Sequence, residues 1–190
     1  MKSRVILLAA VLLAAFSTAE AQKTTTTKKI KLQGVEQVET LSDDGTSIKK
    51  RPYRWFAGIA EADNEATAIE MAQLEAYANI SRVIENIVTS HAERGTIVVN
   101  GKVDLALKSH WEQMSMSIQN ACEPFGETEI TYDSETKMYK VLAKVGIRGD
   151  RYVKILDNAL NAKPEGLSGS DLKEFNEANK TIIDAAKDSE

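Results

Sequence analysis

The clearest hydrophobic pattern in the chain is helical and runs from Ala66 to about Ala92. Apolar residues recur there every three or four positions, which places them on one face of an α-helix. The members of this face are Ile69, Ala72, Ala76, Ile80, Val83 and Ile87, broadened by Ile84 and Val88. Asp63-Asn64-Glu65 supplies an N-cap and an acidic first turn, and Arg94-Gly95 ends the helix. Because alanine dominates the first half of the face, we expect close contact with a sheet there.

Two other regions have the pattern of strands. Residues 55–62 are rich in small side chains, and Gly58 among them indicates a bulge or the close approach of another element. Residues 127–132 and 138–146 flank the polar turn 133–137 and predict a hairpin. Its second arm has one apolar face, formed by Tyr139, Val141, Ala143, Val145 and Ile147. Before the hairpin, Pro124 and Gly126 predict a bulge.

The stretch from Val103 to Ala121 fits two patterns. Residues 103–107 and 114–118 alternate like strands, whereas Val103, Leu107, Trp111, Met114 and Ile118 share the face of a helix. We favour a strand from about 112 to 121, with a helix as the alternative.

The two ends of the mature chain are more polar. Residues 22–52 predict an extended tether with one possible hairpin at Asp44-Gly45. After the strands, Asp150 is expected to cap a short helix whose inner side carries Tyr152, Val153, Leu156 and Leu160. Residues 163–170 have the composition of a linker, and residues 171–187 predict an amphipathic helix. The apolar side of this helix is narrow, so we expect it to dock on a surface and not to belong to the core.

Residues 1–21 have the three parts of a secretory signal. Lys2 and Arg4 precede an uncharged apolar run from Val5 to Phe16, and Ala19-Glu20-Ala21 forms a cleavage site. The run is too short to cross ~30 Å of hydrocarbon. Since Gln22, and not cysteine, follows the cleavage site, we expect an exported protein, periplasmic or secreted, that is neither membrane-spanning nor lipid-anchored.

Composition adds few constraints to this picture. The chain has 190 residues, 43% of them hydrophobic and 27% charged, which is ordinary for a globular protein. Its net charge of −4 gives no basis for binding nucleic acid. A single cysteine, Cys122, excludes an internal disulfide.

No strong catalytic motif is present, whether a nucleophile elbow, a phosphate loop or a zinc-protease helix. His91 and His110 lie nineteen residues apart on different predicted elements, which disfavours a shared metal site. Cys122 and His110 lack a predicted activating cation or oxyanion hole. The sequence therefore predicts no enzymatic activity, no metal and no cofactor.

One arrangement of residues resembles a known family. The strand Trp55-Phe56-Ala57-Gly58-Ile59-Ala60 leads into the alanine-rich helix, and a later hairpin closes with Met138-Tyr139-Lys140-Val141-Leu142-Ala143-Lys144-Val145. Over residues 53–160 this order is similar to that of the bacterial LPP-twenty surface lipoproteins, which in turn resemble flagellar-assembly T-type periplasmic domains. The resemblance implies an α+β fold, with a long helix across a curved antiparallel sheet, a dodecin-like β-α-β-β core and C-terminal helices. It implies no catalytic residues, and the chain lacks the family's acylated cysteine.

These observations divide the chain into a signal peptide (1–21), a polar tether (22–52), an α+β domain (53–162) and a linker with a terminal helix (163–190). We expect a non-enzymatic envelope protein with a structural or protein-binding role, whose partner is another envelope protein or a second copy. The alternative is a binding module for a glycan or small ligand. The residues expected to contact a ligand or partner are Tyr53, Trp55, Trp111 and Tyr139.

Overall fold

The computed structural model describes residues 30–95, 97 and 99–188, and its fold is α+β. Residues 1–30 and 31–190 form separate units, and all the elements described below belong to the second unit. The predicted signal peptide, 1–21, lies outside the described residues. Within 31–190 the structure divides no further.

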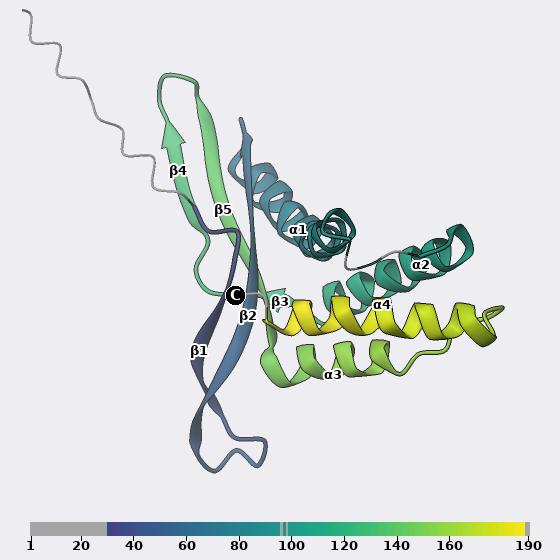
Figure 1. Cartoon of the computed structure of the whole chain (residues 1–190). Helices are drawn as coiled ribbons and strands as arrows, with labels where there is room; N and C mark the ends of the chain where they lie inside the picture. The colour runs from purple at the N-terminus through teal and green to yellow at the C-terminus, as the bar shows by residue number, and fades with distance from the viewer. Residues whose placement is uncertain (1–29, 96, 98, 189–190) are drawn as a thin grey trace, which may run out of the picture. The chain divides into compact units, whose positions relative to one another are not determined.

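The described strands form one antiparallel sheet in the order β1-β2-β5-β3, with β4 also paired to β5 (Figure 1). The strands are β1 (Gln33–Leu41), β2 (Ile48–Ala62), β3 (Glu123–Pro124), β4 (Glu129–Asp133) and β5 (Met138–Arg148). The predicted β4–β5 hairpin is confirmed. The predicted bulge is confirmed as well, because four residues separate Pro124 from Glu129 while only two separate their partners Val145 and Leu142.

The tether prediction needs correction for the part that the structure describes. The possible hairpin at Asp44-Gly45 is real, and β1 pairs with β2 along all nine of its residues, from Gln33 to Leu41. Gly45 makes the turn with a positive φ of 69°. Residues 33–52 are therefore part of the sheet, and their polar sequence reflects the position of β1 at its edge.

Helix α1 (Glu65–Glu93) packs on the sheet as its sequence predicts. The side chain of Asn64 caps it by accepting a 3.1 Å hydrogen bond from the N–H of Thr67. Ala68, Ala72 and Ala76 have no exposed surface. A Cβ placed on Gly58 would lie 2.2 Å from both the carbonyl oxygen of Ala72 and the nitrogen of Ala76. The helix backbone therefore rests directly on β2 at Gly58.

Helix α2 (Gly101–Gln119) shows that the predicted strand at 112–121 is wrong and that the alternative, a helix, is right. Its buried side is the helical face noted in the sequence, Val103, Leu107, Trp111, Met114 and Ile118, whereas Met116 is 56% exposed. The side chain of Asn100 accepts hydrogen bonds from the N–H groups of Lys102 and Val103. The N-cap and the burial of one helical face stabilise a helix here, although the local alternation of Met and Ser also fits a strand.

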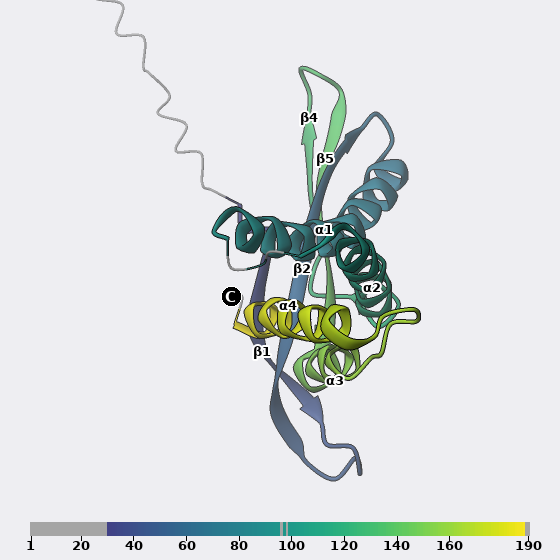
Figure 2. The same ribbon diagram turned by 45° about the vertical axis from the view of Figure 1, so that its right-hand side comes forward.

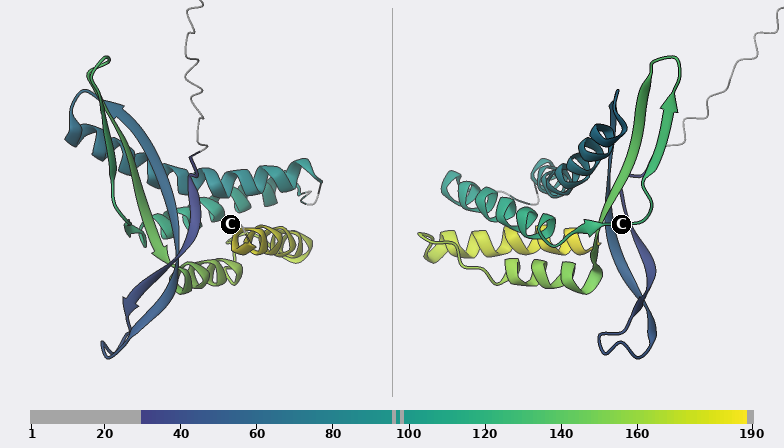
Figure 3. Two further views of the ribbon diagram at one scale, coloured as in Figure 1. Left: turned by 90° about the vertical axis from the view of Figure 1, so that its left-hand side faces the viewer. Right: turned by 180° about the vertical axis from the view of Figure 1, so that it is seen from behind.

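The C-terminal helices complete the core. Helices α3 (Gly149–Leu160) and α4 (Gly169–Asp188) lie beside α2, on the same side of the sheet as α1 (Figures 2 and 3). Phe175, Ile182 and Ile183 of α4 have no exposed surface and belong to the largest hydrophobic cluster. The expectation that this helix docks on a surface and does not belong to the core is therefore wrong. A side that looked narrow in sequence is fully buried because α2 and α3 enclose it.

Contacts at the two ends of α3 and α4 fix their positions. Arg54 of β2 is buried over the ring of Tyr152, with its guanidinium carbon 4.6 Å from the ring centre. The hydroxyl of Tyr152 donates to the carbonyl of Ala186 at 3.1 Å, at the end of α4. Asp150 does not cap α3, contrary to expectation, because the N-cap position is Arg148. Val153, expected to face inward, is 42% exposed.

Candidate functional site

The four aromatic residues expected at a binding site do not form one cluster. Trp111 is only 6% exposed, and its indole N–H donates to the side-chain oxygen of Asn179 at 3.4 Å. Tyr139 lies beside Tyr132, with ring centres 4.9 Å apart, on the side of the sheet that faces the helices. Tyr53 and Trp55 lie on the opposite side, which we call the outer face and define by Tyr53, Trp55 and Lys144. The structure therefore does not bring Trp111 and Tyr139 together with Tyr53 and Trp55.

On the outer face, aromatic rings cover glycines of neighbouring strands. A Cβ on Gly34 would lie 2.8 Å from the ring of Trp55, and a Cβ on Gly146 would lie 2.7 Å from the ring of Phe125. Tyr53 stacks on Phe125, with ring centres 5.5 Å apart and planes 19° apart. The ammonium group of Lys144 is 5.0 Å from the centre of Trp55. These rings are half-buried by the sheet itself, so they stabilise this face without a helix.

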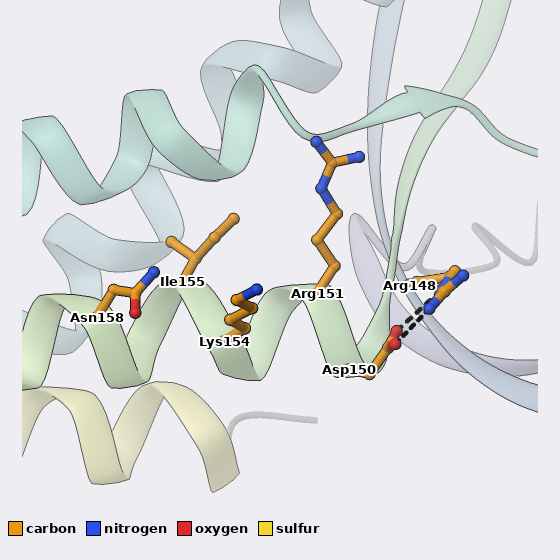
Figure 4. A pocket seen from close by; sticks show the side chains of 6 residues that line it. All are labelled: Arg148, Asp150, Arg151, Lys154, Ile155 and Asn158. Atoms are coloured by element: carbon orange, nitrogen blue, oxygen red, sulfur yellow. Dashed lines mark hydrogen bonds and ion pairs between the residues drawn. The ribbon is translucent and has the colours of Figure 1, made fainter.

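A shallow hollow of about 520 Å³ lies where β5 passes into α3 (Figure 4). It is lined by Arg148, Asp150, Arg151, Lys154, Ile155 and Asn158. Arg148 pairs with Asp150, and this hydrogen-bonded pair lowers the pKa of Asp150 to about 2. Arg148 also lies 3.4 Å from Asp43, so this charge is already matched. The hollow is thus a hydrated, weakly basic surface around Arg151 and Lys154.

Cys122 and His110 are held in structural contacts. Burial raises the pKa of the Cys122 thiol to about 12, so the thiol stays protonated at neutral pH. One ring nitrogen of His110, Nε2, lies 2.8 Å from the carbonyl oxygen of Ala159, and burial lowers the pKa of this histidine. Within the described residues, no three metal-ligating side chains come together. These groups therefore provide no geometry for nucleophilic chemistry.

Strand β4 is an exposed edge strand that was not among the predicted sites. All five of its residues are exposed, including the side chains of Ile130 (42%) and Tyr132 (52%). Among the described residues, β4 pairs only with β5. The tip of the β4–β5 hairpin also extends past the helices (Figure 1).

The hydrogen-bonding pattern of the sheet shows which backbone groups β4 leaves at its outer side. The N–H of Ala57 in β2 donates to the carbonyl of Leu32, the residue before β1. The backbone N–H and C=O groups of odd-numbered β2 residues therefore point toward β1, and those of even-numbered residues point toward β5. The N–H of Phe125 donates to the carbonyl of Lys144. The backbone groups of even-numbered β5 residues therefore point toward β3 and β4. In β4, the residues opposite these even-numbered residues are Glu129, Thr131 and Asp133, and they form the hydrogen bonds to β5. The N–H and C=O groups of Ile130 and Tyr132 therefore point outward, away from β5.

The surroundings of this edge are acidic. The segment 123–136 contains five carboxylates, Glu123, Glu127, Glu129, Asp133 and Glu135, and no lysine or arginine. Hydrogen bonds from the backbone N–H groups of Glu135 and Thr136 lower the pKa of Asp133, which stays ionised. A hollow of about 570 Å³ beside the strand is lined by Asp133 and Glu135 and by Glu61, whose carboxylate lies 2.9 Å from the ammonium group of Lys140. We call these outward backbone groups of Ile130 and Tyr132, with the flanking carboxylates, the β4 edge.

Comparison with protein families, characterised proteins and solved structures finds no match to this chain. In the part of the chain that the structure describes, no helix is both long and apolar enough to cross a membrane. The β4 edge is therefore the candidate site that geometry supports best. The signal that could have revealed it is the run of carboxylates along a predicted hairpin arm, which is usually interpreted as a solvated surface.

Proposed function

We propose that this chain is an exported, non-enzymatic protein of the cell envelope that binds other proteins by accepting an extended segment at the β4 edge. The observation that carries the proposal is the outward direction of the backbone groups of Ile130 and Tyr132 on a fully exposed strand. Extended peptides commonly add to such edges, because main-chain hydrogen bonds supply affinity and alternate side chains supply specificity.

The proposed location and family rest on the sequence. The basic, apolar and small-residue parts of 1–21 support export, and Gln22 after the cleavage site supports an exported form without a lipid. The strand 55–60, the alanine-rich helix and the closing hairpin support kinship with LPP-twenty proteins. Neither proposal assigns a partner, so the choice of partner must come from the chemistry of the edge.

Glycan binding is less well supported by the geometry. A sugar ring stacks best on an exposed aromatic face, and Tyr53 and Trp55 already contact Phe125, Gly34 and Lys144. Trp111 is buried and Tyr139 lies on the other side of the sheet. By contrast, no aromatic side chain has to leave its contacts before a segment binds at the β4 edge.

The test is site-specific photo-crosslinking in the cell envelope. A photoreactive residue at Thr131 should give protein adducts, while one at the exposed Lys180 of α4 should give far fewer. Adding Ile130→Pro should abolish the adducts at 131, because proline removes an outward N–H without removing an N–H bonded to β5. Equal adduct yields at 131 and 180, or adducts unaffected by Ile130→Pro in a folded protein, would contradict the proposed function.

A further inference from the structure

We propose that the segment accepted at the β4 edge is residues 23–31 of a second copy of this chain, so that copies join head to tail. This inference rests on the proposed function and specifies its partner. It follows from the alternation of the edge, from the sequence of 23–31 and from the distance between the two edges of the sheet.

The edge specifies the pattern of an incoming strand. Residues directly opposite each other in a sheet share a face, so a docked strand alternates between two environments. On the outer face it meets the carboxylates of Glu129 and Asp133 and the hydroxyl of Thr131. The hollow beside them is lined by Glu135 and by Glu61, which is paired with Lys140. On the other face it meets the exposed side chains of Ile130 and Tyr132. The matching strand alternates basic and apolar residues.

Residues 29–31 have this pattern, at the end of the basic segment 23–31. The segment Lys23-Thr24-Thr25-Thr26-Thr27-Lys28-Lys29-Ile30-Lys31 contains four lysines and no acidic residue. Threonine and isoleucine favour extended structure, and no proline interrupts the segment. Within it, Lys29-Ile30-Lys31 alternates in the required way, with Ile30 opposite Tyr132 or Ile130 and the lysines opposite the acidic face. Ile30 and Lys31 are both exposed.

The alternating lysines cannot reach the β4 edge of their own chain. Leu32 is fixed at the beginning of β1, where its carbonyl accepts hydrogen bonds of 2.8 Å from the N–H of Ala57 and from the side chain of Asn79. β1 and β4 lie at opposite edges, so four strand spacings, about 19 Å, separate Leu32 from a strand docked on β4. Lys29 is only three residues away and reaches ~11 Å. At the β4 edge, Lys29 and Lys31 must therefore come from another copy.

Charge also disfavours the symmetric alternative, in which two β4 strands pair with each other. Antiparallel pairing centred on Thr131 would place Glu129 of one copy opposite Asp133 of the next. Like charges directly opposite in a sheet are destabilising. A basic strand on an acidic edge avoids this repulsion, and because its two surfaces differ, it produces open chains of copies and not closed pairs.

Sedimentation velocity of the exported protein at increasing concentration tests the inference. The wild type should form species larger than a monomer, and raising NaCl from ~50 to ~500 mM should reduce them by screening the charges. The donor variant Lys29→Glu/Lys31→Glu and the acceptor variant Ile130→Pro should each associate at least about tenfold more weakly. The matched control Lys173→Glu/Lys180→Glu makes the same charge change on α4 and should associate like the wild type.

Mixing the two defective variants gives the decisive result. The acceptor variant keeps its lysines and the donor variant keeps its β4 edge, so the mixture should form 1:1 dimers and nothing larger. A wild type that stays monomeric at all concentrations, or a mixture that stays monomeric, would overturn the inference. If the chain does not associate but the crosslinks at 131 identify a different protein, the proposed function stands and only self-assembly fails.

Discussion

At the scale of single residues, the contact between sheet and helix depends on the absence of a side chain at Gly58. The peptide groups of Ala72 and Ala76 occupy the space that a Cβ would need. The sequence could predict this approach, since a glycine in a strand and alanines on one helix face both indicate it. It could not predict the role of Asn179, a fully buried residue of α4 that accepts from Trp111 and donates to Ala159.

Gly58→Ala should lower the free energy of unfolding by ~1–3 kcal/mol, because the added methyl group overlaps helix backbone that cannot rotate away. Gly101→Ala is the matched control, since a Cβ there meets no atom within 4 Å. Denaturant unfolding of both variants measures the effect. Equal stability of Gly58→Ala and wild type would mean that α1 lies further from β2 than described.

The Cys122 thiol should make stability depend on pH in the alkaline range. Burial raises its pKa to about 12 in the folded chain, whereas an unfolded cysteine ionises near 8.5. The unfolded state therefore loses a proton first, and the stability that this thiol contributes is present below about pH 8.5 and is lost as the pH rises toward 12. Cys122→Ala should show a smaller decrease between pH 8 and 10 in denaturant unfolding. Parallel decreases in the two proteins would show that the thiol is not desolvated.

At the scale of elements, prediction succeeded where a periodic pattern was long and failed where burial depended on distant partners. Helix α1 and the β4–β5 hairpin followed from their own sequences, through the period of three to four residues and the polar turn. Helix α2 was ambiguous because the alternating residues Met114-Ser115-Met116-Ser117-Ile118 fit both patterns. Helix α4 was predicted to lie outside the core because the local sequence does not reveal the helices that enclose Phe175 and Ile182.

The correction at α4 makes a strong prediction. Phe175→Ala should cost about 3–5 kcal/mol, because the ring is fully buried and contacts His110, with ring centres 5.5 Å apart. Asn176→Ala, at the exposed neighbouring position, should change the free energy of unfolding by less than about 0.5 kcal/mol. Thermal and denaturant unfolding check both variants. A Phe175→Ala protein as stable as the wild type would restore the view of α4 as a peripheral helix.

At the scale of the whole molecule, the two faces of the sheet are stabilised in different ways. Core residues from α1, α2, α3 and α4 cover one side, while aromatic rings over Gly34 and Gly146 stabilise the outer face. The β4 edge is an exposed, acidic part of the sheet, on the side opposite β1. The β4 edge could not be derived from the sequence, because the direction of the backbone groups at Ile130 depends on pairing with β5.

The proposed export makes a prediction of its own. Intact-mass measurement of the protein from the envelope should give a chain that begins at Gln22 and carries no lipid, as the cleavage site Ala19-Glu20-Ala21 requires. An acylated species, or an exported chain that keeps residues 1–21, would contradict this location and would require a different account of the N-terminal segment.

The most direct test of the central claim is residue-resolved hydrogen exchange of the β4 amides at low and high protein concentration. In the dilute protein, the amides of Thr131 and Asp133 should be protected because they bond to β5, while those of Ile130 and Tyr132 should exchange quickly. At high concentration Ile130 and Tyr132 should become protected too, and Lys29→Glu/Lys31→Glu should prevent the change. Fast exchange at Ile130 and Tyr132 under all conditions, with assembly still occurring, would show that the β4 edge is not where this protein binds.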